Sequence, residues 1–132
     1  MKQWYHSDVV GSVRALTTGS TGATISAESY SAFGLKAGEQ GKAASNHQFA
    51  GEQLDPTGLY YNRARYYNPA SGRFIQRDSI EGEATSPVSL NHYTYGWNNP
   101  IMQTDPGGNF PGGIVGGNTP PSSRYFRSKI KV

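Results

Sequence analysis

Two aspartates, Asp78 and Asp105, are the residues of this chain whose type could support acid–base chemistry. They lie far apart in a Tyr-rich stretch broken by Pro and Gly, with Arg77 directly before the first and Pro106 directly after the second. Each also has a simpler interpretation, because Asp-Pro is common in turns and an exposed Arg–Asp pair contributes less than about 1 kcal/mol. The residues alone leave both interpretations open.

Other reactive groups are few. The chain has no cysteine, which excludes disulfides, thiolate metal sites and a Cys nucleophile. Its histidines, His6, His47 and His92, are scattered without ligand spacing, so we predict no metal and no cofactor. The many tyrosines could stack on sugars or single-stranded nucleic acid, but packing of rings across strands is the favoured interpretation.

Charge is unevenly distributed along the chain. The formal net charge is +3, yet all nine acidic residues precede residue 110. The end of the chain carries only cations, at Arg124, Arg127, Lys129 and Lys131. We interpret this end as a solvated tail, and predict no specific nucleic-acid partner for it and no membrane span.

The composition predicts a mainly β fold of short antiparallel strands and hairpins. Seventeen Gly and eight Pro disfavour long helices, and nine Tyr suit strand surfaces. Turns are expected at residues 55–58 and 68–72, a mobile loop at 34–47 and a short helix at 80–84. The expected strands are two short segments around residues 8–12, then residues 23–30, 47–53, 59–67, 73–77 and 90–97.

The domain organisation divides at the Gly-rich segment that follows Gly107. We expect a core segment over residues 1–108 and a flexible basic tail over 109–132. We expect the chain to open inside a repeat, and a tail this short is not expected to fold as an enzyme. No apolar run follows Met1, so no signal peptide is predicted.

A series of short motifs runs in a fixed order from residue 4 to residue 108. Each is weak alone, and their combination is specific. They are Tyr5-His6-Ser7-Asp8, Gly11-Ser12, Leu16-Thr17, Tyr30, Phe33-Gly34, Phe49, Gly51, residues 57–67, Gly72-Arg73-Phe74, Asn91, Tyr93, Tyr95, Asn98-Asn99-Pro100, Asp105-Pro106 and Gly108. In this order they resemble the RHS repeat-associated core segment of bacterial RHS/YD-repeat proteins.

The resemblance implies a fold and a role. In the family, repeats spiral into a hollow β-shell that encapsulates a C-terminal toxin, and the core segment plugs one end. These polymorphic toxins are secreted or delivered by secretion systems. The partners implied are therefore the remaining shell repeats and a toxin, and unpaired strand edges predict self-association of an isolated fragment.

The resemblance also implies autoproteolysis. The core resembles an intramolecular aspartyl protease, with catalytic roles carried over to Asp78, Asp105 and Arg77 and the cut expected between Asn109 and Phe110. Two adjacent carboxylates share a proton, so that one acts as base and the other as acid. The chain departs from the family where Ser79-Ile80-Glu81 replaces Pro-Ile-Gly, where Asn109 replaces Leu, and in extra residues at 83–89.

Three functions therefore follow as alternatives. The first is a structural plug for a toxin-encapsulating shell. The second is a working self-cleaving protease, and the third is a carbohydrate-binding adhesion module. The third requires aromatic rings exposed in a groove.

Overall fold

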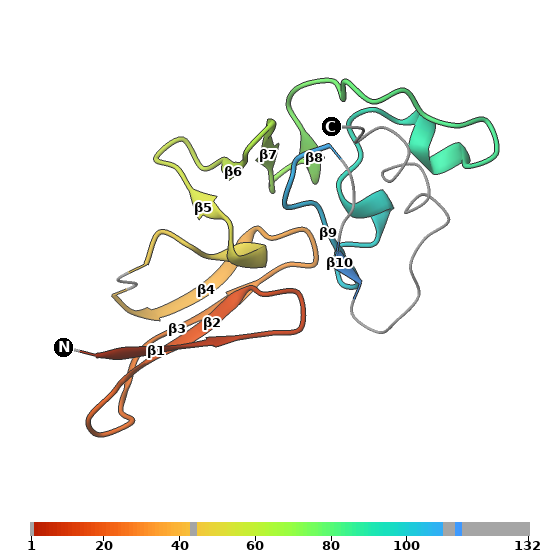
Figure 1. Ribbon diagram of the computed structural model, residues 1–132. Coiled ribbons are helices and arrows are strands. Elements are labelled where there is room, and N and C mark those ends of the chain that lie inside the picture. Colours follow the sequence, from red (N-terminus) through yellow and green to blue (C-terminus); the bar gives the residue numbers. More distant parts are fainter. Residues whose placement is uncertain (1, 43–44, 110–112, 115–132) are drawn as a thin grey trace, which may run out of the picture.

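The described part of the chain folds into two four-stranded antiparallel sheets and one two-stranded ribbon (Figure 1). A computed structural model describes residues 2–42, 45–109 and 113–114. The mainly β class expected from composition is confirmed, since three short 3₁₀ turns are the helical elements of these ranges. No helix among the described residues is long and apolar enough to cross a membrane.

The first sheet is a meander in chain order. It contains β1 (Gln3–Ser7), β2 (Val13–Thr18), β3 (Thr24–Tyr30) and β4 (Lys36–Gly41). The two short strands expected around residues 8–12 are β1 and β2, which lie on either side of a turn. In this turn the Asp8 carboxylate accepts hydrogen bonds from the backbone amides of Val10 and Ser12. The mobile loop predicted over residues 34–47 is wrong for residues 36–41. These residues form an exposed edge strand, which needs backbone pairing with β3 but no apolar side chains.

The second sheet carries the site described below. Its strands, again in chain order, are β5 (Gln53–Leu54), β6 (Tyr60–Asn62), β7 (Arg65–Asn68) and β8 (Arg73–Phe74). The single strand predicted over residues 59–67 is wrong, because the chain reverses after Asn62. Arg63 adopts a left-handed φ of 59° there, a conformation that the sequence does not signal with Gly or Asn. The predicted pairing across the 68–72 turn is confirmed by β7 and β8.

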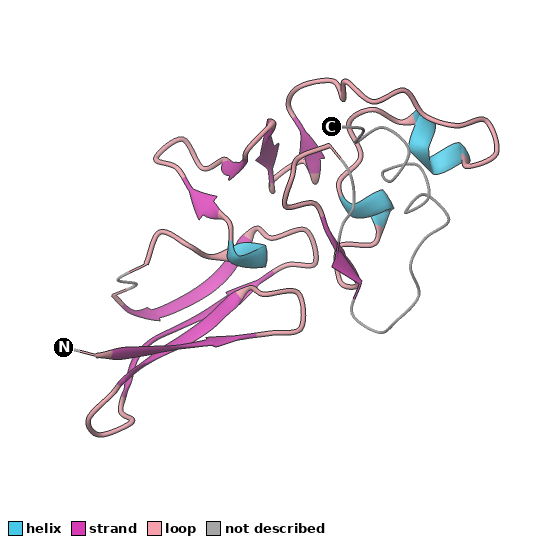
Figure 2. Cartoon of the chain, viewed as in Figure 1, coloured by secondary structure: helices cyan, strands magenta, loops and turns pink. Residues whose placement is uncertain are grey.

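Three 3₁₀ turns replace predicted regular elements (Figure 2). The first, η1 (Phe49–Gly51), interrupts the strand predicted at 47–53. The others are η2 (Pro87–Leu90) and η3 (Gly96–Asn98), which lie at the two ends of the strand predicted at 90–97, and that prediction is wrong. The helix predicted at 80–84 is also wrong, because these residues form no helix. Left-handed backbone at Trp97 and Asn98 ends extended structure in this region.

The remaining strands form a small ribbon beside the second sheet. β9 (Gln103–Thr104) pairs antiparallel with β10 (Gly113–Ile114). β10 lies within the tail predicted over 109–132, and its partner β9 lies within the core segment predicted over 1–108. Most of that tail lies outside the described residues, as does Phe110 of the expected cut.

The core is a row of aromatic rings on the buried face of the second sheet. The register pairs Tyr60 with Tyr67 and Tyr67 with Phe74, so three rings line up across three strands. Tyr95 stacks on Tyr67 with ring centroids 4.2 Å apart, and Phe49 from η1 closes the cluster. Because side chains alternate along a strand, this row also fixes which neighbouring residues face inward.

The turn between β7 and β8 depends on Gly72. Its φ is 67°, and a Cβ there would lie 3.0 Å from Phe33 Cδ1. We therefore expect Gly72→Val to lower the free energy of unfolding by about 1–3 kcal/mol, because a β-branched residue is strained in this conformation. Chemical denaturation measures the effect.

Ser71→Val is the matched control, since Ser71 is exposed in the same turn and lacks a positive φ. Equal stability of the two variants would contradict a conformational role for Gly72.

Candidate active site

The site is built around Arg65, the first residue of β7. Arg65 lies two positions before Tyr67 and therefore on the same, buried face of the strand. Only 4% of its side chain is exposed. The guanidinium carbon stacks 3.7 Å from the ring centroid of Phe74 on β8, and Nη1 donates to the carbonyl of His92 at 2.7 Å. These contacts orient the Nη2 atom of the guanidinium toward two acidic side chains.

Asp78 reaches Arg65 from the segment that follows β8. Its backbone amide donates to the carbonyl of His92, and its Oδ1 accepts from the amide of Ile80 at 2.9 Å. These bonds leave Oδ2 to receive Arg65 Nη2 at 3.0 Å. An Asx-type turn thus holds one carboxylate in a fixed orientation.

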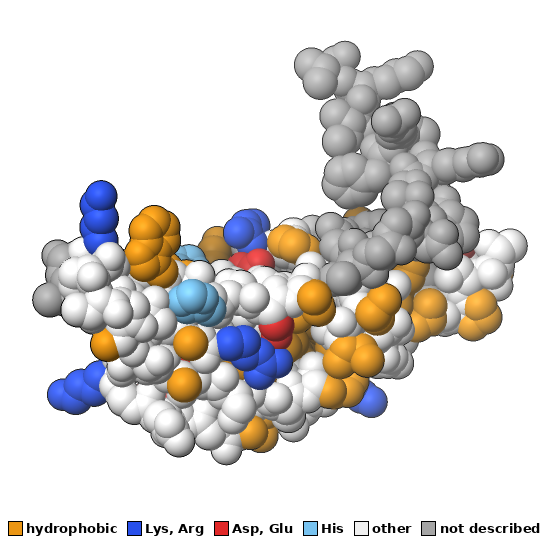
Figure 3. Space-filling view, turned by 90° about the horizontal axis from the view of Figure 1, so that it is seen from below, with side chains coloured by type: hydrophobic (Ala, Val, Ile, Leu, Met, Phe, Trp, Pro, Cys, Tyr) orange, Lys and Arg blue, Asp and Glu red, His pale blue; other side chains and the backbone are white. Residues whose placement is uncertain are grey.

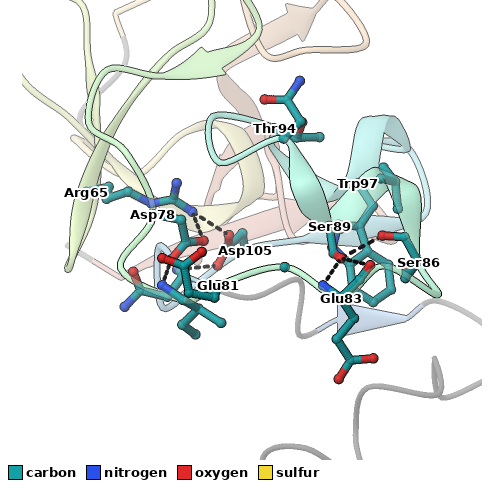
Figure 4. Close-up of a pocket in the computed structure, with 14 residues that line it drawn as sticks. Arg65, Asp78, Glu81, Glu83, Ser86, Ser89, Thr94, Trp97 and Asp105 are labelled. Atoms are coloured by element: carbon teal, nitrogen blue, oxygen red, sulfur yellow. Dashed lines mark hydrogen bonds and ion pairs between the residues drawn. The ribbon is translucent and has the colours of Figure 1, made fainter.

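Asp105 reaches the same guanidinium from the residue directly after β9. It is 1% exposed, and its Oδ2 lies 3.6 Å from the same Nη2 atom of Arg65. Its Oδ1 accepts the backbone amide of Asn109 at 3.1 Å. The structure therefore brings the two sequence-predicted aspartates to one guanidinium nitrogen, and it ties one of them to the residue before the expected cut (Figure 4).

Arg77, the third predicted catalytic residue, occupies a different place. Its side chain is 55% exposed and lies beside Glu81 at 3.4 Å and His92 at 3.1 Å. The cation that pairs with both carboxylates is Arg65. Strand alternation explains the difference, since Arg65 shares the inward face of the Tyr67 row whereas Arg77 lies beyond β8.

The electrostatics of the cluster balance burial against ion pairing. Burial lowers the pKa of Arg65, and the carboxylates of Asp78 and Asp105 oppose this lowering. A guanidinium remains charged in proteins, so the buried cation requires these anions. The cluster consequently has a structural role whatever chemistry it performs.

A pocket opens beside the two aspartates (Figure 4). Ile80, Val88 and Trp97 supply apolar lining, and Asn109 lies at its wall with Asp78 and Asp105. Several of the extra residues at 83–89 also line the pocket. The Ser89 hydroxyl accepts a hydrogen bond from the Glu83 amide at 2.8 Å and so joins the two ends of this segment. Among the described residues no cluster of three or more His, Asp or Glu is suited to a metal ion.

This arrangement has the parts that acid–base hydrolysis of a peptide requires. Two carboxylates face one pocket, a cation can stabilise whichever one is ionised, and a backbone segment is held against them. Sequence reasoning missed Arg65 as a member of the site. The available signal was the spacing of Tyr67 and Arg65, which puts both on one strand face.

The comparisons with known proteins agree with this architecture. No family model matches the chain. It is 38% identical over 114 residues to the tRNA nuclease WapA of Bacillus subtilis and 34% identical over 118 residues to toxin subunit YenC1 of Yersinia entomophaga, with 83% of the chain covered in each case. This chain is homologous to a segment of the RHS/YD-repeat toxins.

Solved structures extend the match to the fold. The RHS segment superposes with a TM-score of 0.71 on the crystal structure of TcdB2-TccC3-Cdc42, at 30% identity over 80% of the chain. A Photorhabdus luminescens Tc holotoxin pore gives the same TM-score at 28% identity over 91% of the chain. The RHS segment spans only 5% of the WapA sequence, 11% of YenC1 and 5% of each solved chain. Its relatives are thus far longer proteins.

The structure makes Arg65 and Arg77 a matched pair for a stability test. We expect Arg65→Met to lower the free energy of unfolding by about 3–5 kcal/mol, because it leaves two carboxylates without their buried cation. Arg77→Met should change it by less than about 1 kcal/mol, since the exposed pair with Glu81 is solvated. Urea denaturation followed by circular dichroism compares the variants, and equal losses would show that Arg65 is not the central cation.

Proposed function

We propose that this RHS segment is the closing plug of a toxin-encapsulating β-shell, with the remaining shell repeats and a C-terminal toxin as its partners in a longer assembly. The observation that carries the proposal is the open first sheet. β1 has no strand on its outer side among the described residues, and all five of its residues are exposed. A sheet that continued into further repeats would cover this edge.

The surface beside that edge supports the same interpretation. Trp4 and Tyr5 on β1 are 60% and 53% exposed. Figure 3 shows apolar side chains at several places on one face of the molecule. Neighbouring shell strands would bury such rings and pair the free backbone groups.

The isolated chain should therefore self-associate through this edge. We expect oligomers by size-exclusion chromatography with light scattering, and a shift toward monomer in Trp4→Lys, because a charge on an edge strand opposes strand addition. Val9→Lys is the control, since Val9 is 71% exposed but lies in the turn after β1. A wild-type monomer at all concentrations would argue against an edge that partners normally cover.

The second proposed function is self-cleavage after Asn109, and a specific observation favours it. The hydrogen bond from the Asn109 amide to Asp105 Oδ1 holds this residue beside both carboxylates. The expected cut is thus one peptide unit away from a group able to act on it. Phe110, on the other side of that bond, lies outside the described residues.

The proposed reaction uses the two carboxylates in opposite roles. One accepts a proton from a water molecule whose oxygen attacks the Asn109 carbonyl carbon, and the other donates a proton to the carbonyl oxygen. Collapse of the tetrahedral intermediate breaks the C–N bond. The nitrogen of Phe110 takes the proton that the first carboxylate removed from water, and the second carboxylate regains a proton from a hydroxyl of the intermediate. Arg65 holds the ionised carboxylate in place and compensates its charge in the buried site.

Self-cleavage predicts two pieces with a new N-terminus at Phe110. We expect Asp78→Asn and Asp105→Asn each to abolish the cut, because an amide cannot exchange the proton. Glu81→Gln is the control, since Glu81 lines the same pocket but pairs with Arg77. Intact mass spectrometry over time measures the reaction, and circular dichroism checks that each variant is folded.

Three outcomes distinguish the possibilities. Cleavage lost only in the two Asn variants supports the dyad. An intact wild-type chain leaves the plug as the function and contradicts self-cleavage. Cleavage that persists in both Asn variants points to a contaminating protease.

The carbohydrate-binding alternative receives no comparable support. Tyr60, Tyr67 and Tyr95 of the Tyr-rich stretch are buried in the core, at most 1% exposed. Their rings stack on one another, which leaves their faces covered. The nuclease and toxin activities named for the relatives belong to far longer chains, and we propose neither for this segment.

A further inference from the structure

Residues at the turn between β6 and β7 donate hydrogen bonds to the backbone carbonyl groups of residues 105–108. Four consecutive carbonyl oxygens, from Asp105 to Gly108, each accept a hydrogen bond from one of four consecutive turn residues. The donors to residues 105, 106, 107 and 108 are, in this order, Asn62 Nδ2 at 2.7 Å, Arg63 Nη1, the Ala64 amide at 3.4 Å and Arg65 Nε. We call residues 62–65 the carbonyl clamp.

The local backbone makes this one-to-one match possible. Asn62 and Arg65 are register partners that face the core, and the left-handed Arg63 between them turns its side chain back along the bound segment. The segment fits because Gly108 has a φ of 72°, and a Cβ there would overlap the Asn62 carbonyl oxygen. Gly107, by contrast, has open space around it.

A separate ion pair holds the exposed member of the clamp. Arg63 Nη1 donates to both carboxylate oxygens of Glu52, at 3.1 and 3.0 Å. Glu52 is 8% exposed; burial raises its pKa, and Arg63 opposes the rise. The Arg63 side chain is therefore fixed from one side by Glu52 and binds Pro106 from the other.

We infer that the carbonyl clamp positions residues 105–109 for cleavage and retains them in the site afterwards, so that each chain cuts once and then occupies its own pocket. This inference rests on the proposed self-cleavage. Its physical basis is that all four clamp bonds end at or before Gly108, and the Asn109 amide is bound by Asp105. Breaking the bond after Asn109 removes none of these contacts.

The clamp residues are positioning residues, because they contact carbonyl groups upstream of the reacting bond. Loss of one should displace the segment and slow cleavage, since about 1 Å of misplacement can cost about a hundredfold in rate. It should also expose the bound backbone to solvent in a chain that never cuts. That second effect is independent of catalysis.

Hydrogen exchange measured by mass spectrometry on the full chain tests the inference. In the wild type, the amides of Gly108 and Asn109, which both donate to Asp105, should exchange slowly. Arg63→Met should speed their exchange about tenfold or more and slow any cleavage, because it removes the Pro106 contact. Arg14→Met is the matched control, since it removes an arginine that pairs with a carboxylate, that of Asp8, in the first sheet and outside the clamp. Asn62→Ala tests a second clamp bond.

Retention is tested without relying on self-cleavage. A protease recognition sequence inserted after Asn109 lets an added protease cut the chain there. Slow exchange of the Gly108 and Asn109 amides that survives this cut supports retention, and fast exchange after the cut overturns it. Equal exchange in wild type, Arg63→Met and Asn62→Ala overturns the clamp itself. If the clamp behaves as expected while the unmodified chain stays intact, self-cleavage fails and the binding of residues 105–109 stands.

Discussion

The buried guanidinium of Arg65 is the interaction on which the second half of this structure depends. It joins β7 to the segment after β8 through Asp78 and to the segment after β9 through Asp105. A cation this deeply buried is costly unless its partners are present. The three segments must therefore assemble together, and the irregular chain between them, with its 3₁₀ turns, is fixed by this requirement more than by regular pairing.

The aromatic row supplies the frame in which that guanidinium can sit. Tyr60, Tyr67 and Phe74 lie side by side across three strands, and Tyr95 stacks over the middle ring. Short strands of two to four residues form few backbone bonds, so large rings provide most of the buried apolar area. Phe74 has both roles, because it ends the row and stacks against Arg65. Packing and charge placement are thus set by the same few residues.

The sequence predicted the parts of the fold that turn chemistry determines. Asp8 and residues 68–72 are of types that favour chain reversal, and the structure has a turn at each place. The strands beside the second turn, β7 and β8, are shorter than the predicted ranges 59–67 and 73–77. The reversal at Arg63 has no such signal in the sequence. Arg63 has a left-handed backbone without being Gly or Asn, and its side chain contacts Glu52 and Pro106, which are distant in sequence. β4 was missed for a related reason, since an exposed edge strand of small and polar residues has no apolar pattern to detect.

The candidate site was predictable only in part. The two aspartates followed from the resemblance, and the structure brings them together. The resemblance implies a role for Arg77 as well, whereas the cation that pairs with both aspartates is Arg65 of β7. Tertiary neighbours of this kind are set by strand register, which a single sequence determines only once its turns are correctly located.

The β9–β10 ribbon bears on what would happen to a severed chain. Only Gln103 and Thr104 pair with Ile114 and Gly113, on the far side of the loop that contains the proposed cut. Backbone hydrogen bonds in water contribute about 0.5–1.5 kcal/mol each. A ribbon this short would therefore hold two separate pieces together with a dissociation constant in the millimolar range at best. While the loop is covalently closed, its ends meet at a high effective concentration and the ribbon persists. Cleavage of the chain between β9 and β10 would remove this advantage. The two pieces would then stay near each other only if a surrounding structure confined them. In a hollow shell, confinement would then take over the role of the peptide bond.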